Sequence, residues 1–194
     1  SYREYKQSEK RKSLSEIYWK KIEITDNKTI TTNKWLFNYQ YAGIIAKSIP
    51  NAKIIHCYRN PLDNILSTYR AHFATGNNFS SSLVDSAKVY SDQDEIMRTY
   101  KKEFKNHIYS LNYDKLVTHP SDEIKSLIHW LGWSWNDLYL SPHLNKRKVS
   151  TRSNVQVRSP INTKSLGGWK NYKEMLKPAM EIITKKEKYK DLKY

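Results

Sequence analysis

Apolar residues along the chain occur either in short continuous runs or at a spacing near 3.6 residues. Residues 53–58 form a short and mostly apolar run, which is typical of a strand buried in a parallel sheet. We therefore predict a buried strand there, with Cys57 filling the core, and a second strand at 107–112.

Helical spacing precedes, separates and follows these two runs. A helix over 37–48 ends before Pro50, as proline requires, and Asn60 and Pro61 are suited to cap and open the next helix, which runs to about Phe73. The remaining predicted elements are helices at 1–21, near 89–105, from Pro120 through Ile124, Leu127, Ile128 and Leu131, and after Pro178, and loops at 23–33 and 75–86.

Strands separated by helices of this length are typical of α/β proteins. We predict one domain over residues 1–194, with a mostly parallel sheet flanked by helices on both faces. Residues 1–22 are predicted to form a basic helical lead-in, and the lysine-rich residues 184–193 a frayed helix end.

Composition adds a large positive charge to this picture. The 194 residues include 34 Lys and Arg against 19 Asp and Glu, a formal net charge of +15. A surplus of this size favours an anionic partner such as nucleic acid, an acidic membrane face, or a phosphate or sulfate ligand. The alternative is a solvated surface whose lysine content reflects an AT-rich genome.

Cysteine content and hydropathy bear on the cellular compartment of the protein. Cys57 is the only cysteine, so an internal disulfide is excluded and a reducing, cytoplasmic location fits best. No run approaches the roughly 18 apolar residues that a membrane span needs.

The segment 58–70 carries the strongest chemical pattern. Arg59 follows a predicted strand, at the sheet edge where ligands of open α/β proteins bind. Asp63, Ser67 and Arg70 recur at helical spacing and share one helix face. Arg59 and Ser67 would then hold one anion near the helix start. The alternative is an ordinary pairing of Arg59 with Asp63.

Residues 52–63 and their continuation to Ser67 resemble the sulfotransferase family, above all the bacterial enzymes often fused to tetratricopeptide repeats and the tyrosylprotein sulfotransferases. In that family an arginine at a strand end and a serine eight residues later bind the 3′-phosphate of the donor 3′-phosphoadenosine 5′-phosphosulfate (PAPS). The resemblance implies this role for Arg59 and Ser67, with help from Arg70.

Further segments match the family in its order. Residues 31–35 imply that Lys34 contacts the bridging oxygen of the donor, and residues 111–116 imply that Tyr113 lines the nucleotide site. The structural alternatives are a solvated surface lysine for Lys34 and, as is more common for this residue type, a core tyrosine for Tyr113.

Two segments near the C-terminus extend the match. Residues 150–162 resemble the Ser-x-x-Gln-Val-x-x-Pro segment of the tyrosylprotein enzymes, which implies catalytic hydrogen bonding by Ser153 and donor binding by Gln156. The stretch after it resembles a loop that covers the 3′-phosphate and implies donor contacts by Lys164 and Trp169. A plain polar loop and a packing tryptophan are the structural alternatives.

The chain departs from the family at its beginning. The Ser-, Thr- and Gly-rich loop that holds the 5′-phosphosulfate has no counterpart, since the first glycine is Gly43 and the first proline Pro50. The catalytic glutamate that tyrosylprotein enzymes place after that loop is also missing. We therefore expect an N-terminally incomplete domain of the nucleotide-kinase-like sulfotransferase fold, matched over 23–175 and followed by a C-terminal helix over 176–194.

The resemblance implies sulfuryl transfer from PAPS to a protein tyrosine, carbohydrate or small alcohol, without a metal. The alternative is a non-catalytic basic module that binds nucleic acid or another polyanion. The histidines show no paired metal-ligand spacing, and neither a G-x-x-x-x-G-K-[ST] loop nor a G-x-S-x-G elbow occurs. These absences argue against zinc sites, P-loop NTPases and α/β-hydrolases.

Overall fold

The computed structural model describes residues 14–21, 30–71, 73, 76–146 and 156–192. The chain divides into two compact units. Unit 1 combines residues 1–54 with 96–109, and unit 2 combines residues 55–95 with 110–194. The single domain over 1–194 stays a prediction.

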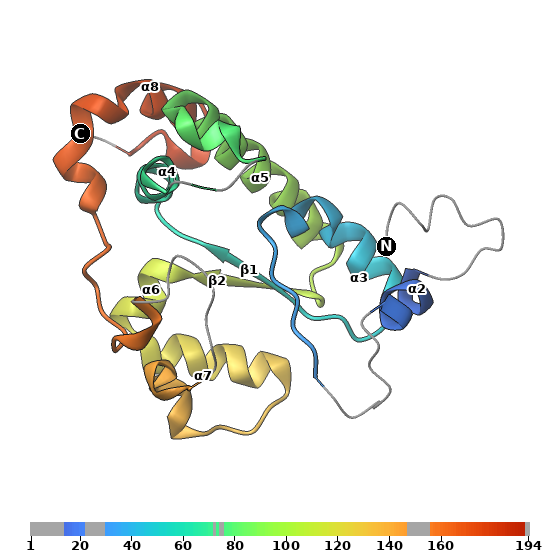
Figure 1. The fold of residues 1–194 in the computed structure, drawn as a ribbon. Coiled ribbons are helices and arrows are strands. Elements are labelled where there is room, and N and C mark those ends of the chain that lie inside the picture. Colours follow the sequence, from blue (N-terminus) through green and yellow to red (C-terminus); the bar gives the residue numbers. More distant parts are fainter. Residues whose placement is uncertain (1–13, 22–29, 72, 74–75, 147–155, 193–194) are drawn as a thin grey trace. The chain divides into compact units, whose positions relative to one another are not determined.

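The sheet consists of two strands, β1 (Ile54–Tyr58) and β2 (Ile108–Asn112), which are hydrogen-bonded neighbours and run parallel (Figure 1). Both strands and the α/β class are as predicted. The predicted core position of Cys57 is wrong, because Cys57 and Ile55 are exposed while His56 between them is buried. A continuous apolar run suggests burial on both faces, but alternate side chains of a strand point to opposite faces, and in β1 the face that carries Ile55 and Cys57 is exposed.

Unit 1 holds α2 (Leu14–Lys21), η1 (Leu36–Tyr41), α3 (Ala42–Ser48) and the second part of α5 (Leu83–Glu103). Its core joins Ala42, Met97 and Ile108. A Cβ on Gly43 would lie 2.5 Å from a ring carbon of Tyr100, so the close approach of α3 to α5 depends on this glycine. The helix predicted over 37–48 is confirmed, with a 3₁₀ first part.

Unit 2 is built on α4 (Pro61–Arg70) and α8 (Lys173–Ile183), which lie side by side with the first part of α5 (Figure 1). Its core residues come from these three helices and the segments around them: Leu62, Ile65, Leu66, Ala87, Tyr90, Trp169, Leu176, Ala179, Met180, Ile183 and Tyr189. Burying these side chains is the main contribution to the stability of the unit.

Further α-helices and 3₁₀ helices also belong to unit 2. They are η2 (Asn78–Ser81), α6 (Tyr113–Thr118), α7 (Pro120–Leu131), η3 (Asp137–Leu140), η4 (Pro142–Leu144), η6 (Gln156–Arg158), η7 (Gly168–Tyr172) and η8 (Glu187–Tyr189). The helix predicted from Pro120 is confirmed. None of the helices within the described ranges is both long and apolar enough to cross a bilayer.

Two predicted boundaries are wrong for local reasons. Residues 76–86 are not all loop: they contain η2 and the start of α5, where the Ser82 hydroxyl caps the helix by accepting a hydrogen bond from the Asp85 N–H at 3.1 Å. Helix α8 begins at Lys173, so Pro178 lies inside it. Burial of Leu176 and Ala179 against α4 outweighs the hydrogen bond that proline removes.

The lysine-rich segment after α8 forms the 3₁₀ helix η8 rather than a continuation of the C-terminal helix. Lys186 donates a hydrogen bond to the Ser91 carbonyl at 2.7 Å and pairs with Glu95 at 3.3 Å, and Lys188 pairs with Asp94 at 2.9 Å. These contacts attach the C-terminal segment to α5.

Candidate functional site

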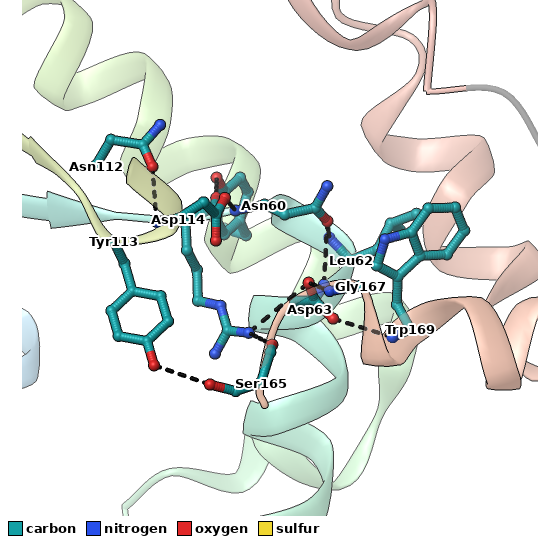
Figure 2. Close-up of polar contacts among 11 residues, drawn as sticks. Asn60, Leu62, Asp63, Asn112, Tyr113, Asp114, Ser165, Gly167 and Trp169 are labelled. Carbon is teal, nitrogen blue, oxygen red and sulfur yellow. Dashed lines mark hydrogen bonds and ion pairs between the residues drawn. The ribbon is translucent and has the colours of Figure 1, made fainter. Parts of the chain in front are cut away.

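Each strand of the sheet leads into a helix through an asparagine cap (Figure 2). The Asn60 side chain accepts hydrogen bonds from the N–H groups of Leu62 at 2.9 Å and Asp63 at 3.2 Å. The Asn112 side chain accepts one from the Asp114 N–H at 2.8 Å. Because helix starts leave backbone N–H groups without internal partners, these caps fix where α4 and α6 begin.

The two strand ends are joined to each other. The Asn60 N–H donates to Asp114 Oδ2 at 2.8 Å, and the Tyr90 hydroxyl donates to the Arg59 carbonyl at 3.0 Å. The backbone on both sides of the Arg59–Asn60 bond is therefore held, which fixes the direction in which Arg59 leaves β1.

The Arg59 guanidinium lies against Tyr113 and the segment 165–169. Its Nη2 donates to the Ser165 carbonyl at 2.6 Å, and its Cζ lies 5.1 Å from the centre of the Tyr113 ring. The hydroxyls of Tyr113 and Ser165 are 2.8 Å apart. Figure 2 marks the hydrogen bond between them. The structure thus brings together Arg59 and Tyr113, which the sequence assigned to one nucleotide site.

Asp63 is buried and holds the same segment from α4. Its Oδ2 accepts a hydrogen bond from the Gly167 N–H at 2.7 Å and its Oδ1 accepts one from the Trp169 N–H at 3.0 Å (Figure 2). Arg59 Nη2 lies 3.8 Å from Asp63 Oδ2, so the pairing weighed as an alternative does occur. It coexists with the contact between Arg59 and Ser165.

The segment itself has a backbone suited to this contact. Gly167 has φ of +67°, a conformation that residues with a Cβ rarely adopt. The Trp169 side chain is buried in the core of unit 2, which agrees with the alternative that it is a packing tryptophan. It therefore anchors the segment 165–169.

One donor of the site lacks an acceptor. Arg59 Nε is buried without a hydrogen-bond partner among the described residues, although the side chain as a whole is 18% exposed. The exposed part of the guanidinium is what an anionic ligand can contact, and charge-assisted hydrogen bonds of this kind are strong.

The other predicted residues lie outside this contact network. On α4, Ser67 and Arg70 are exposed, and Arg70 Cζ lies 5.9 Å from the Tyr172 ring centre. Lys164 is exposed next to Ser165. Lys34 is exposed in unit 1, immediately before Trp35, which precedes η1.

Two predicted residues belong to the segment after η4. Ser153 lies outside the described residues, and Gln156 is the first residue of η6. Their predicted roles in catalysis and donor binding stay predictions.

Sequence reasoning missed the tyrosine pair beneath Arg59. The Tyr90 and Tyr189 hydroxyls are 3.4 Å apart, and burial raises the pKa of Tyr189 to about 12 and also raises the pKa of Tyr90. A tyrosine on a helix carries no sequence signal for such a contact. Asp114 was also missed, although it follows an asparagine at a strand end, as Asp63 does.

Among the residues that the structure describes, no group of three or more His, Cys, Asp or Glu side chains is placed to hold a metal ion.

Comparison with known proteins gives three findings. The model of the sulfotransferase family matches residues 3–137. A protein of Aquifex aeolicus (strain VF5), described as uncharacterized, is 32% identical over 176 residues, which cover 89% of this chain and 23% of that protein. Protein-tyrosine sulfotransferase 1 of Danio rerio is 27% identical over 145 residues, which cover 71% of this chain and 41% of that enzyme. The chain thus spans less than half the length of either relative.

Proposed function

Because the chain belongs to the sulfotransferase family, we propose that it transfers a sulfuryl group from PAPS to a hydroxyl acceptor. The bond between sulfur and the bridging oxygen of the donor breaks, and a bond from sulfur to the acceptor oxygen forms. The acceptor gives up its proton, and 3′-phosphoadenosine 5′-phosphate leaves. By analogy with phosphoryl transfer, such a step depends on in-line positioning and on cations near the leaving group.

The observation that carries the proposal is the partly exposed Arg59 guanidinium after the end of β1, beside the start of α4. We assign the 3′-phosphate to this guanidinium, which is 18% exposed and oriented by Tyr113 and Ser165. Ser67 would donate to the same phosphate.

The remaining predicted residues take supporting roles in this proposal. Arg70 adds positive charge on α4, Tyr113 lines the nucleotide site, and Lys164 lies next to the segment 165–169 that would cover the phosphate. Trp169 anchors that segment in the core, which makes its part in donor binding indirect. Gln156 is assigned to the donor from the family segment alone.

Lys34 and Ser153 are assigned to the reacting end of the donor. A lysine ammonium near the bridging oxygen would stabilise the negative charge that develops as the bond breaks, and a serine hydroxyl would donate a hydrogen bond nearby. The exposed position of Lys34 leaves its ammonium accessible to a ligand.

The test is calorimetric titration with 3′-phosphoadenosine 5′-phosphate and with adenosine 5′-phosphate, which lacks the 3′-phosphate. Arg59→Ala removes a charged donor, and charge-assisted hydrogen bonds contribute about 1.5–3 kcal/mol each. We expect about 10- to 150-fold weaker binding of the first ligand and nearly no change for the second.

Arg98→Ala is the matched control, because Arg98 is an exposed arginine of α5 and its loss changes net charge equally. It is expected to keep the preference for the 3′-phosphate. Should Arg59→Ala keep that preference intact, Arg59 is a structural arginine and this assignment fails.

A further inference from the structure

Asp63 is the third residue of α4, and the backbone N–H group that an acidic side chain at this position usually binds is bound by Asp114 instead. Asn60 is the cap of α4 and Asp63 is the third residue of the helix, where an acidic side chain commonly accepts a hydrogen bond from the N–H of the capping residue. Here the Asn60 N–H donates to Asp114 instead, at 2.8 Å. Both carboxylate oxygens of Asp63 are therefore available to another segment.

That segment is 165–169, and Asp63 and Arg59 hold it with opposite polarity. Asp63 accepts hydrogen bonds from two of its N–H groups, at 2.7 and 3.0 Å, and Arg59 donates to one of its carbonyls at 2.6 Å. Asp63 is only 4% exposed, so its charge depends on these partners for compensation. The position of the segment and the orientation of the guanidinium are thus set by one contact network.

We propose that Asp63 is a positioning residue that couples the placement of the segment 165–169 to anion binding by Arg59. The inference rests on the proposed function, because the anion is taken to be the 3′-phosphate. When the segment is held by Asp63, the Ser165 carbonyl fixes Nη2 and the guanidinium faces the ligand in one orientation. When Asp63 is replaced by Asn, the segment 165–169 is held less firmly, and the guanidinium of Arg59 loses its fixed orientation.

The sign of the effect separates this role from a simple counter-charge. Asp63 Oδ2 lies 3.8 Å from Arg59 Nη2 and offsets part of its positive charge. If this were its whole contribution, Asp63→Asn would leave Arg59 more attractive and tighten the binding of a phosphate. A positioning role predicts weaker binding, because asparagine keeps one acceptor and turns an NH₂ toward the other backbone N–H.

The experiment compares wild type, Asp63→Asn and Asp85→Asn in titrations with 3′-phosphoadenosine 5′-phosphate and adenosine 5′-phosphate. Asp85→Asn makes the same charge change at an exposed site on α5. We expect Asp63→Asn to lower the preference for the 3′-phosphate about tenfold or more, and the control to keep it. An unchanged or increased preference in Asp63→Asn overturns the inference.

Amide hydrogen exchange tests the same coupling in the wild-type chain, so that a poorly folding variant does not decide the matter. Binding of 3′-phosphoadenosine 5′-phosphate should slow exchange at 165–169 more than adenosine 5′-phosphate does, and more than at the control segment η8. Equal exchange with and without the ligand overturns the inference. A wild type that binds both nucleotides equally overturns the proposed function itself, before any variant is compared.

Discussion

A nearly buried charged side chain needs partners of opposite polarity, and Arg59 and Asp63 meet that need differently. Asp63 has two backbone N–H partners in addition to the arginine. Arg59 has a carbonyl and a carboxylate on Nη2, yet its buried Nε lacks a partner among the described residues. At this scale the aspartate is satisfied by the protein alone, whereas the arginine keeps an unpartnered Nε and an 18% exposed side chain.

Ser67 offers a cleaner probe of the phosphate assignment than Arg59, because its side chain is exposed on α4. Ser67→Ala removes one neutral donor, and we expect about 3- to 10-fold weaker binding of 3′-phosphoadenosine 5′-phosphate in calorimetry. The melting temperature should not change, since exposed substitutions rarely alter stability.

Ser126→Ala, at an exposed position of α7, is the control for Ser67→Ala and should affect neither ligand. If Ser67→Ala binds the nucleotide as tightly as wild type does, Ser67 has no part in the phosphate site.

Among the elements, those with local signals were predictable from sequence. Asn60 and Pro61 mark the start of α4 correctly, and the apolar runs mark both strands. Predictions failed where tertiary packing overrides local preference. Pro178 lies within α8 because that helix packs on α4. The lysine-rich segment after it forms η8, and its Lys186 and Lys188 pair with acidic residues of α5.

The candidate site was predictable to a similar extent. Arg59 follows β1 and Tyr113 follows β2. Because the carboxyl ends of parallel strands lie at one edge of a sheet, the order of the predicted strands is enough to explain why these two side chains are close. The contacts of Asp63 with Gly167 and Trp169 span more than a hundred residues. No periodicity or spacing encodes such a long-range pairing.

The contact between η8 and α5 buries the Tyr189 side chain, and we expect this burial to make the stability of the fold sensitive to alkaline pH. Burial raises the pKa of Tyr189 from its ordinary value of 10.0 to about 12, so the unfolded chain loses this proton first as pH rises. The contribution of Tyr189 to folding stability is therefore fully present below about pH 10 and is lost as pH rises toward 12. Thermal melts from pH 8 to 11 should show a smaller alkaline loss in Tyr189→Phe than in wild type. Parallel curves would mean that Tyr189 titrates alike in both states.

For the whole molecule, the net charge of +15 does not by itself specify a partner. Part of the lysine content forms contacts within unit 2, as Lys186 and Lys188 do with Glu95 and Asp94. Ion pairs of this kind contribute little stability each, but they show that not every lysine is available to a ligand. The remaining charge is compatible with one bound nucleotide or with a long polyanion.

Salt dependence distinguishes these two possibilities. A polyanion contacting about 6–10 cationic side chains loses about 10³- to 10⁵-fold in affinity between about 50 and 200 mM salt. A single nucleotide held at Arg59 engages far fewer charges, so we expect less than about tenfold loss for 3′-phosphoadenosine 5′-phosphate over the same range. The measurement is titration of that nucleotide, and of a labelled single-stranded oligonucleotide, at both salt concentrations. Tight oligonucleotide binding with a steep salt slope, together with no measurable nucleotide binding, would favour a non-catalytic polyanion-binding module over a sulfotransferase.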